Sequence, residues 1–135
     1  MTTELPPVHD RKPTAVVLQR IENGVIAIAI LAAVIVAGLP WWVLFAAFLL
    51  FDLSALGYVR NARVGAFWYN IVHNYAAPAA IMGAYVIALA AGIDVRWIAL
   101  LAACWGFHVA VDRALGYGLK AASFSETHLG RIGRQ

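Results

Sequence analysis

The segment from residue 64 to residue 92, VGAFWYNIVHNYAAPAAIMGAYVIALAAG, contains no charged side chain over 29 positions. A stretch this apolar predicts a transmembrane helix, because lipid cannot hydrogen-bond to the backbone and a helix pairs its own polar groups. At about 1.5 Å per residue the segment is longer than the hydrocarbon core, which is roughly 30 Å thick. We therefore expect it to tilt, to kink near Pro78, or to begin as an interfacial turn.

Three further apolar segments accompany this one, over about 21–39, 41–58 and 95–115. Hydrophobic residues make up 63% of the chain and charged residues 13%, about half the charged share of a soluble domain. Short connections favour antiparallel neighbouring helices. The predicted fold is all-α, a polytopic membrane protein with an antiparallel four-helix transmembrane bundle over residues 14–118. A flexible polar tail over 1–13 and a polar cytoplasmic tail over 119–135 flank it.

Basic residues predict the orientation, because cytoplasmic loops are enriched in Lys and Arg. Nine of the ten lie at one end of the predicted bundle, and only Arg96 lies at the other. We expect both termini in the cytoplasm and the protein in a bacterial inner membrane. The basic residues flank apolar runs and form no dense patch, which argues against a nucleic-acid partner. The expected partner is the lipid bilayer, and a homo-oligomer is compatible with the sequence.

Ionisable side chains in the spans are few and lie at similar depth. Such groups are costly in a membrane and by default indicate function. His108 and Asp112 are four residues apart and share one helix face. We predict that a divalent metal, Zn, Mn or Fe, binds at Asp52, His73, His108 and Asp112, because carboxylate and imidazole suit these ions. Glu22 is a further ligand or a general base, so the catalytic candidates are Glu22 and Asp112.

A metal-bound water becomes a nucleophile at neutral pH, so the first hypothesis is a metal-dependent hydrolase acting on a lipid or another amphiphile. The candidate substrate-binding residues at its mouth are Asn70, Tyr58, Tyr117, Arg113 and Lys120.

Three alternatives remain open. Buried acids and histidines also form proton relays, so a small transporter or proton-coupled channel is the second hypothesis. His73 and His108 as axial ligands would make a haem protein. In the last alternative, the protein is a structural membrane module and the polar cluster only holds its helices together. Asp112 would then pair with Arg113 or Lys120, and Glu22 with Arg20.

Several short motifs resemble those of one bacterial membrane-protein family. They are Asp52-Leu53-Ser54, Leu56-Gly57-Tyr58, Val64-Gly65-Ala66, Tyr69-Asn70, His73, Pro78, His108, Asp112-Arg113, residues 115–120 and Thr127-His128-Leu129-Gly130. The sequence resembles, from about residue 22 to residue 133, the family known as domain of unknown function 4260. Phe51 stands where that family usually has proline. The resemblance implies no activity, but it adds His128 and Lys120, both in the C-terminal tail, to the candidate site residues. A weaker similarity links the motifs to membrane-bound metal-dependent hydrolases.

Overall fold

In a computed structural model of the chain, the structure describes residues 14–121, 125–128 and 130–131. The expected flexible tail over 1–13 lies outside these residues. The elements in chain order are α1 (Thr14–Val36), α2 (Val43–Ala46), the 3₁₀ helix η1 (Phe48–Val59), α3 (Ala62–Val72), α4 (Ala76–Ala90), α5 (Arg96–Leu115), β1 (Glu126–Thr127) and β2 (Gly130–Arg131). The fold is helical apart from the two short strands.

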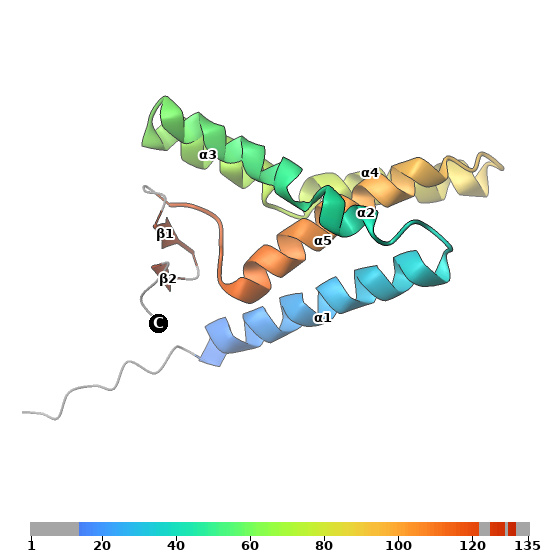
Figure 1. The fold of residues 1–135 in the computed structure, drawn as a ribbon, viewed down its shortest axis with the longest axis horizontal. Coiled ribbons are helices and arrows are strands. Elements are labelled where there is room, and N and C mark those ends of the chain that lie inside the picture. Colours follow the sequence, from blue (N-terminus) through green and yellow to red (C-terminus); the bar gives the residue numbers. More distant parts are fainter. Residues whose placement is uncertain (1–13, 122–124, 129, 132–135) are drawn as a thin grey trace, which may run out of the picture.

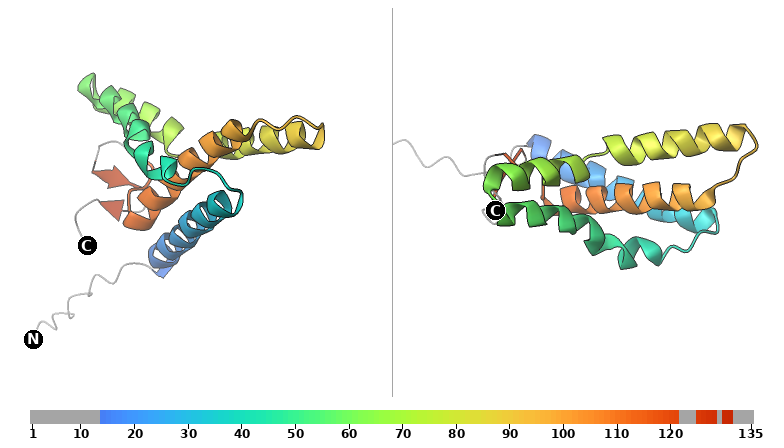
Figure 2. Two further views of the ribbon diagram at one scale, coloured as in Figure 1. Left: turned by 45° about the vertical axis from the view of Figure 1, so that its right-hand side comes forward. Right: turned by 90° about the horizontal axis from the view of Figure 1, so that it is seen from above.

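Helix α5 lies at the centre of the fold (Figure 1) and packs against α1, α4, α2 and η1. Its packing faces carry small buried side chains, including Ala102, Ala103 and Ala110. Small residues allow helix backbones to approach closely where lipid supplies no hydrophobic driving force. Helices η1 and α3 pair with each other and diverge from α1, as the left view of Figure 2 shows. The arrangement is therefore less regular than the expected bundle of four equal helices.

Within the described residues, three helical segments are long and apolar enough to cross a bilayer: 14–36, 62–90 and 96–115. They agree with a multi-pass membrane protein. The first begins at Thr14, seven residues before the apolar run that the sequence marks. Most of the large apolar side chains of this helix are exposed, among them Val25, Ile28 and Val36. In a bilayer this surface faces lipid rather than water.

The second span differs from the single α-helix expected over 41–58. It is divided at Ala47 into α2 and the twelve-residue 3₁₀ helix η1. A 3₁₀ helix rises about 2.0 Å per residue, but this apolar segment, Val43–Val59, is not among the three described segments long enough to cross a bilayer. Side chains three residues apart line up on such a helix, and Phe48 and Phe51 both pack on the ring of His108. The altered helix type therefore shapes the wall of the site described below.

The third span is broken at residues 73–75, between α3 and α4, and not at Pro78. Proline has no amide N–H, and its ring clashes with the carbonyl four residues earlier, here that of Asn74. Pro78 itself sits in the first turn of α4, where a missing donor costs little. The proline therefore acts one turn upstream, and of the three possibilities given for this span, the structure has a break shortly before Pro78.

Side chains satisfy the backbone groups that the break exposes. Asn74 donates from Nδ2 to the carbonyls of Asn70 and Ile71 and accepts from the amide of Ala76. It therefore ends α3 and begins α4. The indole of Trp105 donates to the carbonyl of Val72 over 2.6 Å. Because unpaired backbone groups are costly in lipid, these bonds hold the break in one conformation.

The C-terminal segment turns back beside the helices. Gly116 adopts a positive φ of 100°, and the amide of Tyr117 donates to the carbonyl of Asp112 over 2.8 Å. This is the Schellman pattern that closes many helices. Arg20 donates from Nε to the carbonyl of Ala114, so α1 helps to cap α5. Strands β1 and β2 form an antiparallel pair between α1 and α3 (Figure 1), which is ordered structure that an all-α prediction did not include.

Candidate metal centre

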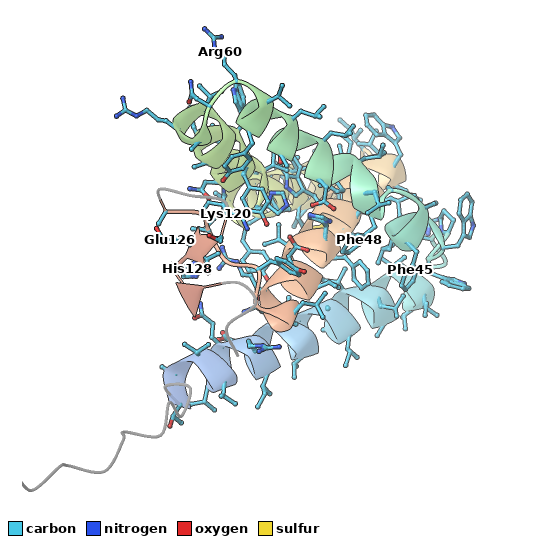
Figure 3. All side chains as sticks on the ribbon, turned by 60° about the vertical axis from the view of Figure 1, so that its left-hand side comes forward. Phe45, Phe48, Arg60, Lys120, Glu126 and His128 are labelled. Atoms are coloured by element: carbon cyan, nitrogen blue, oxygen red, sulfur yellow. The ribbon has the colours of Figure 1, made fainter. Side chains whose placement is uncertain are left out.

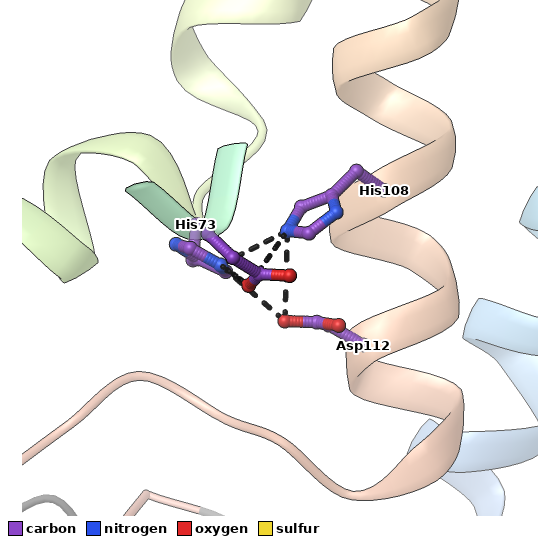
Figure 4. A group of neighbouring side chains, drawn as sticks. His73, His108 and Asp112 are labelled. Carbon is purple, nitrogen blue, oxygen red and sulfur yellow. Dashed lines mark hydrogen bonds and ion pairs between the residues drawn. The ribbon is translucent and has the colours of Figure 1, made fainter. Parts of the chain in front are cut away.

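Four ionisable side chains meet where η1, the broken third span and α5 come together. Asp52 comes from η1, His73 from the end of α3, and His108 and Asp112 from α5 (Figure 4). One ligand atom of each lies within 4.8 Å of the ligand atoms of the other three. These are the four residues predicted as metal ligands. The side chain of Asp52 is 42% exposed while that of His108 is completely buried, so the cluster is open on the Asp52 side.

The spacing of the ligand atoms matches a single small cation. Two atoms that each lie about 2.1 Å from a tetrahedral ion are about 3.4 Å apart. Nε2 of His73 lies 3.4 Å from both Asp52 Oδ1 and Asp112 Oδ2. Nε2 of His108 lies 3.7 Å from the same two oxygens and 3.0 Å from Nε2 of His73. Five of the six distances therefore lie close to the required length. The sixth, between the carboxylate oxygens of Asp52 and Asp112, reaches 4.8 Å, so one bound ion would draw these two side chains closer together.

The orientation of His73 is fixed by a bond on the far side of its ring. Nδ1 lies 2.9 Å from the carbonyl oxygen of Tyr69. A carbonyl only accepts, so Nδ1 carries the proton, and Nε2 of the neutral ring presents its lone pair to the cluster. Metal-ligating histidines usually donate their second nitrogen in this way. His108 is held by Phe48 and Phe51 and meets His73 edge to face.

Tyr69 contributes three contacts to the cluster although the sequence analysis did not select it. Its hydroxyl donates to Asp112 Oδ2 over 3.2 Å, its carbonyl accepts from His73, and its ring stacks on that of His73 at 3.6 Å. The sequence gives two signals: Tyr69 belongs to the Tyr69-Asn70 motif of the family resemblance, and its position four residues before His73 places both on one helix face. Tyr69 orients one carboxylate and one imidazole together.

A cation at the cluster would offset the cost of placing two carboxylates together, of which Asp112 is buried and Asp52 is partly exposed. Burying an ionised carboxylate without a partner is strongly unfavourable, and Asp52 and Asp112 both face the same two imidazoles. Two nitrogen and two oxygen donors are a set that Zn, Mn and Fe accept. The residues present therefore fit a divalent metal ion.

Comparison with protein families now identifies the chain. A family model described as Domain of unknown function (DUF4260) matches residues 16–132. The chain belongs to this family. The family resemblance inferred from the motifs is confirmed, and all four cluster residues lie inside the matched range. Searches of curated proteins and of solved structures found no match.

Glu22 lies outside the cluster of this DUF4260 chain. Its side chain is exposed on α1, and it is not among the residues whose ligand atoms converge. Its neighbour Asn23 is buried and accepts a hydrogen bond from the hydroxyl of Tyr75. Adjacent helical residues point about 100° apart, so only one of the two can face the interior. The structure therefore gives no support to Glu22 as a ligand or general base.

Two of the predicted substrate-binding residues instead hold the C-terminal segment of the DUF4260 chain. The amide of Asn70 donates to the carbonyl of Lys120 over 2.9 Å and accepts from its backbone N–H over 2.7 Å. His128 pairs with Leu119 in the same reciprocal way, accepting at Nδ1 and donating from its backbone N–H. Figure 3 shows Lys120 and His128 close together between α1 and α3. These bonds fold the segment against α3.

The remaining predicted mouth residues lie nearby in different roles. Arg113 donates to the carbonyl of His73 and lies over the ring of Tyr75. The ring of Tyr58 packs against Gly65, where a Cβ would lie 2.2 Å from Tyr58 Cγ. Tyr117 is 41% exposed. Burial lowers the pKa of Lys120, whose ammonium lies over the ring of Tyr69.

We expect the C-terminal segment to dock less firmly at acidic pH. Burial, reinforced by Arg113, lowers the pKa of His128, and its Nδ1 must be unprotonated to accept from Leu119. The contribution of this hydrogen bond to the docking free energy is therefore fully present when the pH is above the ordinary histidine pKa of about 6.5. It decreases as the pH falls from there toward the lowered pKa. Hydrogen exchange at the Leu119 amide, corrected for intrinsic rates, measures the loss.

The His128→Asn variant is the control for this pH dependence. An asparagine side chain supplies an oxygen acceptor near the position of Nδ1 and does not titrate. Protection of the Leu119 amide should then be independent of pH across the same range. Equal pH dependence in both proteins would show that another group is responsible.

Proposed function

We propose that the chain is a membrane-embedded metal-binding protein whose centre holds one divalent ion through Asp52, His73, His108 and Asp112. The observation that carries the proposal is the convergence of four ligand atoms from three separate segments, all within 4.8 Å of one another. Second-sphere bonds from Tyr69 to Asp112 and from His73 to a backbone carbonyl support it. We place the protein in a bacterial inner membrane with both termini in the cytoplasm, on the distribution of its basic residues.

We further propose that the centre catalyses hydrolysis of a lipid or another amphiphile. The exposed side of Asp52 leaves room for a water or substrate atom, and a bound metal makes water nucleophilic near neutral pH. An open pocket of about 500 Å³ is lined by residues of η1, α3 and α5 but by none of the four cluster residues, and Phe51 in its wall packs on the ring of His108. Its walls are mainly apolar and include Phe51, Val72 and Trp105, which adjoin cluster residues in sequence or space. Such walls suit an acyl chain.

The other hypotheses have less support. Axial imidazoles of a haem bind on opposite faces of the macrocycle, and nitrogens only 3.0 Å apart leave no room for a ring between them. A proton-coupled pathway needs polar groups beyond the cluster. Helix α4, which continues the third span, contains no charged residue and no histidine.

Metal content tests the proposal directly. We expect purified protein, stripped with a chelator and re-equilibrated separately with Zn²⁺, Mn²⁺ and Fe²⁺, to retain about one equivalent of at least one ion. Elemental analysis after removal of free metal measures it. The Glu22→Gln variant should retain the same amount, because Glu22 is exposed and outside the cluster. Retention far below one equivalent for every ion would overturn the metal centre.

A further inference from the structure

A second cavity lies on the opposite face of α5 from the metal centre. It is an open groove of about 430 Å³ between α1 and α4, with α5 as its floor. Gly106 lines this groove, whereas His108, two positions later, belongs to the cluster. Residues two positions apart on a helix point about 200° apart, so the groove and the cluster use different faces of α5. A ligand in the groove is therefore separate from any substrate of the metal centre.

The groove exists because its floor carries only small side chains. Helices α1 and α4 each pack on α5, and their apolar side chains, such as Ile30 and Met82, form the two walls. A Cβ at Gly106 would lie 3.4 Å from Cδ1 of Ile30 and 3.9 Å from Cβ of Pro78, so both walls come close at that point. The floor beyond it consists of three alanines, Ala99, Ala102 and Ala103. These side chains are too short to fill the space between the walls.

The surroundings of the groove are lipid rather than water. All three helices around it belong to the described segments that are long and apolar enough to cross a bilayer. The hydrocarbon core holds no water that could occupy an apolar groove. An empty groove would deprive its walls of dispersion contacts, so an apolar group from the membrane fills it.

The dimensions of the groove favour an alkyl chain over a helix. Its floor extends from Arg96 to Gly106, and these ten steps along α5 rise about 15 Å. A volume of about 430 Å³ over that length gives a mean width of about 5 Å. A helix with its side chains is about 10–12 Å across, whereas carbon atoms in contact lie only about 4 Å apart. The groove therefore accepts one extended chain and excludes a whole helix.

Polar contacts with α1 mark the two ends of the groove. At one end Tyr75 lines it and donates from its hydroxyl to Asn23. At the other end Arg96 lines it and donates to the carbonyl of Ala37. A guanidinium has five N–H donors, so this bond leaves Arg96 able to bind a ligand as well. Only the Arg96 end therefore carries a full charge.

The charge at that end complements a lipid phosphate. Arginine at the end of a membrane span extends to the depth of the lipid headgroups, and guanidinium and phosphate can form two parallel hydrogen bonds. The nearby carboxylate of Asp94 accepts a hydrogen bond from the hydroxyl of Tyr85. Among the described residues, Asp94 and Arg96 form no ion pair with each other.

We propose that the groove between α1 and α4 binds one acyl chain of a phospholipid, whose phosphate pairs with Arg96. The chain fills the space that the small residues of α5 leave, and the headgroup lies at the turn between α4 and α5. The lipid contacts both walls and so stabilises the packing of α1 and α4 on α5. This site goes beyond the proposed function and does not require a bound metal.

Lipid binding to the full chain in a neutral detergent tests the groove. Protein stripped of lipid is titrated with dioleoylphosphatidylglycerol, and native mass spectrometry measures the bound lipid. Ala33 is exposed and lines the groove, so the ring of Ala33→Phe should occupy the groove. We expect this variant to bind the lipid at least about tenfold more weakly, because an overfilled space resists a further group. Ala79→Phe, from the α4 wall, should act in the same way.

Ala32→Phe is the matched control. Ala32 is also exposed on α1 but does not line the groove, so the variant should bind lipid like the wild type. An affinity in Ala33→Phe and Ala79→Phe equal to that of the wild type would overturn the proposal, as would an equal loss in Ala32→Phe. Protein dimers that Ala33→Phe dissociates and Ala32→Phe does not would identify a second copy as the occupant and also overturn it.

The headgroup contact is tested with a lipid that lacks phosphate. Arg96→Gln should bind dioleoylphosphatidylglycerol about fivefold more weakly, the usual effect of one basic residue at a lipid surface. It should bind dioleoylglycerol, which has the same chains, as tightly as the wild type does. Arg96→Lys should recover most of the loss, and Arg63→Gln, which removes an exposed cation outside the groove, should match the wild type. Equal phosphatidylglycerol affinity in Arg96→Gln and the wild type would overturn the phosphate contact.

Discussion

Replacing His108 by leucine is expected to lower the affinity for the metal at least about 100-fold. Even changes in the second sphere of a metal site cost about 10- to 100-fold, and His108 is a predicted ligand itself. Its Nε2 lies within 3.7 Å of the other three ligand atoms. The remaining three ligands would leave one corner of the tetrahedron open. Competition with a metal-sensitive dye measures the change.

The same substitution should leave the metal-free fold intact. The side chain of His108 is completely buried against Phe48 and Phe51, and leucine is an apolar residue that this pocket accepts. Replacing a buried polar group by an apolar one costs little when no buried partner is left unpaired, and Nε2 of His73 keeps its contacts with Asp52 and Asp112. Thermal unfolding of the metal-free variant in detergent should therefore begin no lower than that of the metal-free wild type.

Adding metal should then separate the two proteins. A ligand present at 100 times its dissociation constant stabilises the folded state by about 2.7 kcal/mol. The unfolding temperature of the wild type should rise accordingly, and that of His108→Leu should not. Glu22→Gln is the matched control and should respond like the wild type. An equal response of His108→Leu would mean that the stabilising metal binds elsewhere.

The four cluster residues could be selected from the sequence because a membrane makes ionisable groups conspicuous. In a chain with 13% charged residues, a carboxylate or imidazole inside an apolar span has no solvent to account for it. The i, i+4 spacing of His108 and Asp112 then gives their shared face directly, because α5 is a regular helix. Comparing their distance from the helix ends placed Asp52 and His73 at the same depth.

The same reasoning also selected Glu22, which the structure leaves outside the cluster, and the difference has a physical reason. Depth along a helix says nothing about direction around it, and α1 is apolar on nearly every side, so its sequence does not indicate which face meets α5. The structure buries Asn23 and Ala27, which leaves Glu22 exposed. The small buried residues of α5, including Ala103 and Ala110, are what allow α1 to pack against it with this face.

The helix breaks and the C-terminal fold depend on contacts that leave little trace in sequence. Helix α3 ends where the side chain of Asn74 binds the carbonyls of Asn70 and Ile71. The position of the break therefore depends on these hydrogen bonds as well as on the proline. The bonds between Asn70 and Lys120 join residues fifty positions apart. The hydrophobic periodicity of the sequence does not reveal such a pair.

Tyr69→Phe is expected to weaken metal binding about 10- to 100-fold, the usual effect of losing a second-sphere partner. The substitution removes only the hydroxyl that donates to Asp112. The ring remains to stack on His73, and the backbone carbonyl that accepts from His73 Nδ1 is unchanged. Every predicted ligand is therefore still present, and the loss measures orientation of the carboxylate alone.

Tyr85→Phe is the matched control, since it also removes a tyrosine hydroxyl that donates to a carboxylate, here that of Asp94, which is outside the cluster. Metal titration of the two variants under the same conditions should show a clear loss for Tyr69→Phe and a small change for Tyr85→Phe. Equal affinities in both would contradict the orienting role of Tyr69. In the double variant Tyr69→Phe/Asp112→Asn the loss should be no larger than in Asp112→Asn, because the hydroxyl acts through that carboxylate and coupled residues are not additive.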